Sequence, residues 1–431
     1  MSGDSAAERF AGRALHFIGI GGAGMSGLAL VARQLGASVT GSDQAESSYS
    51  ERLRAAGIEP AIGHDAANVP EGAEVVVSTA IPDDNPELAA ARAAGARILH
   101  RADLLGELSR MKKTIAVSGT HGKTTTASMI ALVLLEAGRD PMFLIGGELR
   151  AAGTNAAWGD GEWAVIEADE SDRSFLKLRR DVAVVTNIEL DHHATYGSLR
   201  ELEEAFAEFT GQADTVISGT VAALADGVEL GRGSSRFRVD GTEIELQVPG
   251  EHNVLNALAA LAALRAAGVE PAEAAPALAK FTGAGRRFEA HGRTPSGAEV
   301  YDDYAHHPTE VRATLEAART LEPRRLVAAF QPHLFSRTRM LAREFGESLA
   351  LADLVVVLDI YRAREDPADF PGVTGYLVAE AAADAAGGRP VWWMPTVDDA
   401  EPRLRAELTE GDVLVTLGAG NVDELAKRLT A

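Results

Sequence analysis

The chain has 431 residues, of which 46% are hydrophobic, and a formal net charge of −22. At roughly 100–200 residues per domain, this length predicts two or three domains. The acidic charge argues against a nucleic-acid partner, whose phosphates require a basic face. The absence of cysteine excludes disulfides and thiol nucleophiles and fits a reducing, cytoplasmic location.

A glycine turn follows the first predicted strand, residues 15–18, and leads into a helix that ends near Leu35. Glycines interrupt the apolar stretch 14–31, so we expect strand, turn and helix here rather than a membrane span. The turn reads GIGGAG, and Asp43 follows 19 residues after its last glycine, Gly24. A diphosphate can lie on such a helix start while the acid binds a ribose hydroxyl. The pattern admits NAD, a UDP-sugar or a turn without a ligand.

The first unit continues with predicted strands at 38–41 and 75–80 and closes with 98–110, so the second unit begins near Ser109. It opens with TIAVSGTHGKTTT, residues 114–126, in which a strand breaks into a glycine turn and a helix. Backbone N–H groups and the helix dipole suit a triphosphate here, with Lys123 on its β/γ oxygens and Thr124 near Mg²⁺. The standard P-loop has a glycine where this chain has Val117, and a chance turn is the alternative. The residues predicted to contact ATP are Gly119, Thr120, His121, Gly122, Lys123, Thr124 and Thr125.

Carboxylates and histidines follow the next two predicted strands, 163–168 and 182–187. The run EADESD begins at Glu167, and His192 lies shortly after the second strand. Ligands of parallel sheets bind at such strand ends, and Mg²⁺ prefers oxygen ligands. We therefore predict a cation site, against the alternatives of a solvated acidic loop and a structural histidine.

A hairpin is predicted over 236–248, with its turn at Asp240-Gly241, and a helix over 253–267. A third unit follows the loop at 293–297, with strands at 299–302, 326–330, 354–359 and 413–417. Polar runs after two of these strands indicate a pocket in which Arg337 binds a carboxylate. The alternative is that Arg337 and Arg339 form surface ion pairs.

Taken together, these motifs resemble those of the Mur ligases of peptidoglycan synthesis. The resemblance covers essentially the whole chain and rests on HFIGIGGAGMSGLA, GTHGKTTT, EADESD, TNIELDHH, EHNVLNALAA, DDYAHHPTEV, FQPHLFSRTR and LGAGNV. It implies an α/β fold of three domains. These are a Rossmann-like UDP-binding domain (1–108), a central P-loop-type ATPase domain (109–293) and a C-terminal Rossmann-like domain (294–431).

The opening motif is most similar to that of the members that join L-alanine to UDP-N-acetylmuramate. The resemblance therefore implies ATP-dependent amide formation through an acyl phosphate, with Mg²⁺ or Mn²⁺, in cell-wall synthesis. It also implies a protein of the cytoplasm that is not inserted in a membrane and is a monomer or weak homodimer.

Residue roles follow from the resemblance, position by position. Glu167 and His192 match the ligands of a second metal, Asn253 and Asn256 match an adenine-contacting helix start, and Arg287 matches a residue near the phosphates or ribose. Tyr304, His306 and Arg337 match the alanine side of the site, and His306 is the expected base. The residues expected around the uridine diphosphate are Gly21, Ala23, Gly24, Met25, Ser26, Asp43, Ser78, His100 and Arg101.

One departure and three alternatives bear on this assignment. Several sister ligases carry a carbamylated lysine about fifteen residues past the metal histidine, whereas this chain has no lysine from 192 to 211. That counts against the members that add acidic amino acids or dipeptides. The alternatives are a ligase that adds a recycled murein tripeptide, an NAD-dependent oxidoreductase and a nucleotide-binding scaffold. The oxidoreductase leaves GTHGKTTT and EADESD unexplained.

Overall fold

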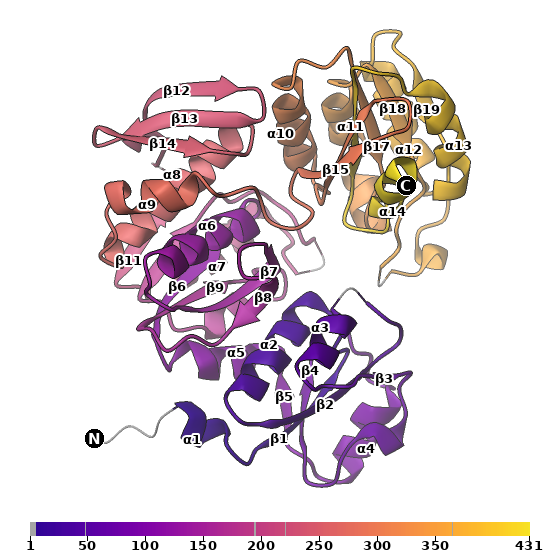
Figure 1. Ribbon diagram of the computed structural model, residues 1–431. Helices are drawn as coiled ribbons and strands as arrows, with labels where there is room; N and C mark the ends of the chain where they lie inside the picture. The colour runs from indigo at the N-terminus through magenta and orange to yellow at the C-terminus, as the bar shows by residue number, and fades with distance from the viewer. Residues whose placement is uncertain (1–5, 48, 194, 220, 364) are drawn as a thin grey trace. The chain divides into compact units, whose positions relative to one another are not determined.

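The computed structural model describes residues 6–47, 49–193, 195–219, 221–363 and 365–431, so the first five residues of the polar start lie outside it. The chain forms two compact units. Figure 1 labels their helices and strands. The first comprises residues 1–222 and 256–277, and the second comprises 223–255 and 278–431.

The first unit begins with a five-stranded parallel sheet of order β3-β2-β1-β4-β5. Its strands are β1 (Ala14–Ile18), β2 (Ser38–Asp43), β3 (Ala61–Ile62), β4 (Glu74–Val77) and β5 (Ile98–His100). Its helices are α1 (Ala6–Phe10), α2 (Ala23–Gln34), α3 (Ser50–Ala55), α4 (Pro86–Ala93) and α5 (Arg101–Ser109). Side chains alternate between the faces of each strand, so Phe17 packs with Leu28 of α2, whereas Ile18 packs with Leu88 of α4.

A second sheet in the same unit has the order β11-β10-β6-β9-β7-β8, and β8 alone runs antiparallel to its neighbour. Its strands are β6 (Lys113–Ser118), β7 (Met142–Leu149), β8 (Thr154–Ala157), β9 (Trp163–Glu167), β10 (Val182–Val185) and β11 (Thr215–Ser218). Helices α6 (Lys123–Glu136) and α7 (Leu199–Thr210) belong to it, and α8 (Glu251–Ala266) and α9 (Pro271–Leu278) follow later in the chain. The first two sheets share one hydrophobic core, and Gly27 of α2 lies against Leu144 and Ala156 of β7 and β8.

The second unit contains two sheets. An antiparallel sheet has β12 (Asp226–Gly231), β13 (Ser234–Val239) and β14 (Thr242–Leu246), and the predicted turn at Asp240-Gly241 joins the last two. The other sheet has the order β15-β16-β20-β17-β18-β19, with only β15 antiparallel. Its strands are β15 (Glu289–Arg293), β16 (Glu299–Asp303), β17 (Arg325–Phe330), β18 (Leu354–Val357), β19 (Val391–Trp393) and β20 (Asp412–Leu417).

Helices cover this last sheet on both faces. The helices are α10 (Pro308–Arg319), α11 (Phe335–Leu349), α12 (Tyr376–Ala385), α13 (Val397–Glu407) and α14 (Asp423–Thr430). Side chains of α10, α11 and α12 share one core cluster, and side chains of α13 and α14 share the other. No helix of the described residues is both long and apolar enough to cross a membrane, and the stretch 14–31 is the predicted strand, turn and helix.

Candidate active site

Side chains at the end of β2 and shortly after it bind the first glycine turn. Asp43 Oδ2 accepts the N–H of Gly21 at 2.8 Å, and Ser47 Oγ donates to the Gly21 carbonyl at 2.9 Å. A Cβ on Gly21 would come within 2.9 Å of the same carboxylate oxygen, so a side chain would collide there. Asp43 therefore shapes the turn in this structure, in addition to the ribose contact predicted for it.

The remaining residues predicted for this site start helices or follow strands. Ala23, Gly24, Met25 and Ser26 form the first turn of α2, where Met25 and Ser26 are buried. Ser78 follows β4, and His100 caps α5 by accepting the N–H of Ala102. The structure thus places these residues at the carboxyl ends of β1, β4 and β5.

Two glycines of the second turn have conformations that other residues rarely adopt. Gly119 has φ of 134° and Gly122 has φ of 81°. A Cβ on Gly119 would lie 2.1 Å from Thr186 Oγ1, and one on Gly122 would lie 2.3 Å from Asn256 Oδ1. Asn256 is buried in α8 and also accepts a hydrogen bond from Thr126 of α6 at 3.3 Å. Helix α6 begins at Lys123, as predicted.

Lys123 lies among oxygen atoms at the start of α6. Its Nζ donates to the carbonyls of Gly119 and Thr120 at 2.6 and 3.2 Å, and to Glu170 Oε1 at 2.9 Å. Burial would lower the pKa of Lys123, but the neighbouring carboxylates, led by Glu170, raise it above its ordinary value. The side chain is therefore charged before any phosphate binds.

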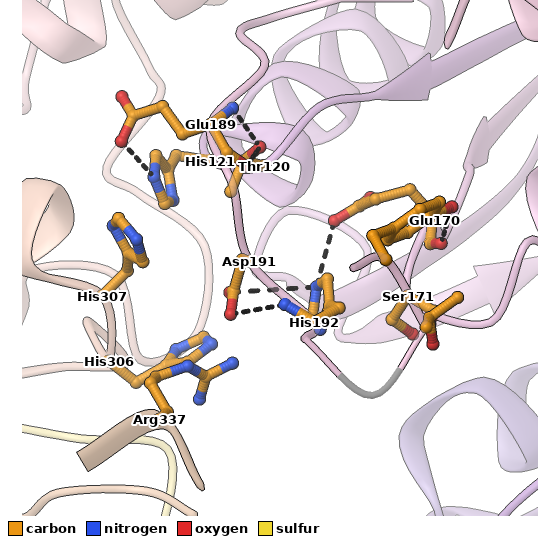
Figure 2. Close-up of polar contacts among 12 residues, drawn as sticks. Thr120, His121, Glu170, Ser171, Glu189, Asp191, His192, His306, His307 and Arg337 are labelled. Carbon is orange, nitrogen blue, oxygen red and sulfur yellow. Dashed lines mark hydrogen bonds and ion pairs between the residues drawn. The ribbon is translucent and has the colours of Figure 1, made fainter. Parts of the chain in front are cut away.

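The predicted cation ligands lie at the start of α6, at the end of β9 and after β10. Thr124 Oγ1 donates to Glu167 Oε1 at 3.0 Å, and the N–H of Gly146 donates to Glu167 Oε2 at 2.6 Å. His192 Nε2 lies 3.3 Å from Glu170 Oε1 (Figure 2). His192 itself has a positive φ of 55°, which is uncommon for a residue other than glycine.

Glu170 is a site residue that the sequence reasoning missed. It lies in the EADESD run, but residue type and spacing alone do not tell which of the run's four acidic residues turn inward. Glu170 is 1% exposed. Two others of the run, Asp169 and Asp172, bind Arg101 of α5 at 2.7 and 3.0 Å. Although burial would raise the pKa of Asp169, the Arg101 guanidinium holds it well below its usual range.

The second compact unit brings together the residues predicted for the alanine side. His306 Nδ1 lies 2.9 Å from the Tyr304 carbonyl oxygen, and the rings of His306 and His333 are 5.8 Å apart. Arg337 Nη1 lies 3.2 Å from His333 Nδ1. Arg337 is 3% exposed, so the alternative that it forms a surface ion pair is wrong. His333 was not predicted, although it lies in the FQPHLFSRTR run.

The other two residues predicted to contact the nucleotide have local partners. Arg287 lies over the Tyr304 ring, with its guanidinium carbon 4.9 Å from the ring centre. Asn253 is buried in the first turn of α8 and donates to the Pro249 carbonyl at 2.8 Å.

Comparison with known proteins identifies relatives over most of the chain. Three family models match: "Mur ligase family, catalytic domain" over residues 14–113, "Mur ligase middle domain" over 117–226 and "Mur ligase, glutamate ligase domain" over 286–420. The chain is 48% identical to a UDP-N-acetylmuramate–L-alanine ligase of Streptomyces coelicolor, over 96% of each chain. It is 46% identical to the enzyme of the same name from Acidithiobacillus ferrooxidans, again over 96% of each.

The chain belongs to the Mur ligase family. A crystal structure of UDP-N-acetylmuramate-alanine ligase from Thermotoga maritima matches it with a TM-score of 0.82 and 31% identity, covering 96% of this chain and 97% of that one. A murein peptide ligase from Psychrobacter arcticus matches with a TM-score of 0.71 and 27% identity, covering 97% and 98%. The predicted three-domain α/β fold of an ATP-dependent Mur ligase is confirmed. The boundaries after 108 and 293 and the roles of individual residues stay predictions.

Proposed function

We propose that this Mur ligase joins L-alanine to the lactyl carboxylate of UDP-N-acetylmuramate and cleaves ATP to ADP and phosphate. The observation that carries the proposal is the convergence of Lys123, Thr124, Glu167 and His192 at one sheet edge. The alanine-adding enzymes named above support the choice of amino acid. We further propose that the reaction takes place in the cytoplasm, which the absence of cysteine favours.

The first step activates the carboxylate. One of its oxygens attacks the γ-phosphorus, the bond from phosphorus to ADP breaks, and an acyl phosphate forms. Both reactants are anionic, so the charged Lys123 and the N–H groups of the turn lower their repulsion. The second step makes the amide: the alanine nitrogen attacks the acyl carbon, phosphate leaves, and the nitrogen loses a proton.

His306 is our candidate for taking that proton. Its Nδ1 lies 2.9 Å from a carbonyl oxygen, which can only accept, so Nδ1 carries the hydrogen in the neutral ring. Nε2 is then the basic nitrogen. Arg337 supplies a cation to the alanine carboxylate.

The side chains at the ends of β9 and β10 fit a divalent cation. Thr124 and Glu167 offer oxygen, His192 offers nitrogen, and a buried oxygen of Glu170 has no hydrogen-bond partner among the described residues. Hard cations such as Mg²⁺ and Mn²⁺ accept this donor set. When bound, the ion offsets the negative charge of the reacting phosphate. We propose that Thr124 binds one such ion and that Glu167 and His192 hold a second.

Phosphate release from ATP tests the function. With Mg²⁺, we expect release only when UDP-N-acetylmuramate and L-alanine are both present. Lys123→Met should reduce the rate at least about 100-fold, since it removes a charge aimed at the transferred group. Lys113→Met is the matched control, because Lys113 is exposed and pairs with Glu162 at the start of β6. Release that needs a murein tripeptide in place of alanine would instead identify the recycling ligase.

A further inference from the structure

Glu170 has one occupied and one open carboxylate oxygen. Oε1 accepts from Lys123 Nζ at 2.9 Å and lies 3.3 Å from His192 Nε2. Oε2 is buried and has no hydrogen-bond partner among the described residues. A buried carboxylate oxygen without a partner costs free energy, so it indicates a site at which a ligand binds.

The backbone around Glu170 is fixed by the segment that follows β10. Tyr196 is fully buried, and its hydroxyl donates to the Glu170 carbonyl at 2.7 Å. Thr195 Oγ1 donates to the Ser171 carbonyl at 2.6 Å, and Ser174 Oγ donates to the Asp169 carbonyl at 3.1 Å. Burial raises the pKa of Tyr196 to about 12, so its hydroxyl keeps the proton that it donates. Glu170 is therefore held inward by a built structure.

Glu167 differs from Glu170 in this respect. Both oxygens of Glu167 already accept hydrogen bonds, one from Thr124 and one from the N–H of Gly146. Of the two carboxylates, Glu170 is the one that combines an open oxygen with a position beside His192.

We propose that Glu170 is a ligand of the divalent cation held by His192, and that the same carboxylate holds Lys123 in position. Adjacent ligands of an octahedral ion with bonds of about 2.1 Å lie about 3 Å apart. His192 Nε2 lies 3.3 Å from Glu170 Oε1, the oxygen that accepts from Lys123, so the Glu170 carboxylate lies close enough to His192 to share one ion with it through its open oxygen Oε2. The inference rests on the proposed function only for the identity of the reaction that uses the ion.

This assignment predicts opposite effects on the metal and on the nucleotide. Glu170→Gln removes a negative ligand, so the cation should bind more weakly. The same change releases Lys123 from its carboxylate partner, so ADP without metal should bind as tightly as before or more tightly. A loop that simply collapsed would weaken both.

Two binding measurements test the proposal. Electron paramagnetic resonance measures the binding of Mn²⁺ alone, and calorimetry measures the binding of ADP in the presence of EDTA. We expect Glu170→Gln to weaken Mn²⁺ binding about ten-fold or more, because even indirect partners of metal ligands contribute that much. Glu162→Gln is the matched control, since Glu162 pairs with exposed Lys113 just before β9, the strand that leads to Glu167 and Glu170. It should change neither affinity.

The proposal would be overturned if Glu170→Gln bound Mn²⁺ within two-fold of the parent's affinity. It would also be overturned if the variant lost affinity for Mn²⁺ and for ADP in parallel. If Glu170→Gln does not fold, Glu170→Asp keeps the charge and withdraws the oxygens by one methylene. Weaker Mn²⁺ binding by that variant supports the proposal, and unchanged binding overturns it. Neither readout requires turnover, so failure of the ligase assay leaves the result intact.

Discussion

Gly122 illustrates how a single residue decides whether the ATP turn forms. Its positive φ and the nearness of Asn256 are two separate obstacles to any side chain. The first is a local backbone strain, which costs roughly 1–2 kcal/mol in the left-handed region. The second is a collision between the added side chain, just before the start of α6, and Asn256 of α8.

We predict that Gly122→Ala reduces ADP affinity about ten-fold or more, because Asn256 and the turn must move apart. Gly138 is the matched control, since it follows the other end of α6 with φ of 67°, and a Cβ on it would meet no atom within 4 Å. Gly138→Ala should lower stability by about 1 kcal/mol and leave ADP binding unchanged. Calorimetric titration with ADP and thermal unfolding of both variants measure the two effects. Equal ADP affinities in the two variants would refute the role of the collision.

At the scale of elements, most strands that read as continuous apolar runs were predicted well, and so were the more polar β2 and β16. Strands β1, β6, β9, β10, β17 and β20 lie within one or two residues of their predicted positions, because buried parallel strands have a plain apolar signature. Strands β7 and β8 were not predicted. Their sequences contain glycine and asparagine, and they are held by pairing with β9 and packing on α2.

The residues of the candidate site also divide into those that could be predicted and those that could not. Glycines, Lys123 and the strand-end acids could be recognised from residue type and spacing. Which acid turns inward could not, because the choice between Glu170 and its neighbours depends on contacts with Tyr196 and Arg101, which are distant in sequence. Motifs identify a sheet edge, whereas tertiary contacts select the side chains that face it.

One buried carboxylate, Glu87 of α4, joins β1, β2 and the segment that contains Asn68. It accepts hydrogen bonds from Ser42 Oγ of β2 at 2.5 Å and from Asn68 Nδ2 at 2.6 Å, and it lies 3.3 Å from His16 Nε2 of β1. Burial opposes its charge, but these partners lower the pKa of Glu87 to about 2. The carboxylate therefore stabilises the fold above its ordinary pKa of 4.5, and that contribution is lost as the pH falls through about 2.

We predict that Glu87→Gln lowers the free energy of unfolding of the first unit by roughly 1–3 kcal/mol at pH 7. The difference from the parent should shrink between pH 4.5 and pH 2, because the parent then loses its own charge. Thermal unfolding of the parent and the variant across this pH range measures the difference in stability. Glu59→Gln is the control, because Glu59 pairs with Arg54 at the exposed surface and such pairs contribute little. A difference that grew toward low pH would contradict the prediction.

At the scale of the whole molecule, the two nucleotide turns lie on separate sheets of one compact unit, and charged pairs join those sheets. Arg101 of α5 binds Asp169 and Asp172 in the loop that carries Glu170. Its Nη1 also lies 3.2 Å from where a Cβ on Gly24 would be, so it adjoins the first glycine turn. Arg52 of α3 also joins the two sheets, because it pairs with Glu148 of β7. Among the described residues, this ion pair involves neither the first glycine turn nor the EADESD loop.

This arrangement predicts that Arg101 couples the two sites, whereas Arg52 only joins the sheets. Arg101→Ala leaves Asp169 and Asp172 without their guanidinium partner beside Glu170. A hydrogen bond between charged groups contributes roughly 1.5–3 kcal/mol. We therefore expect kcat to fall about ten-fold and KM for UDP-N-acetylmuramate to rise, while Arg52→Ala changes each less than two-fold. Steady-state kinetics with each substrate varied in turn measure both. If Arg101→Ala raised only the KM for the sugar nucleotide and kept kcat, Arg101 would serve the first site alone, and the carboxylates of the EADESD loop would hold their positions without it.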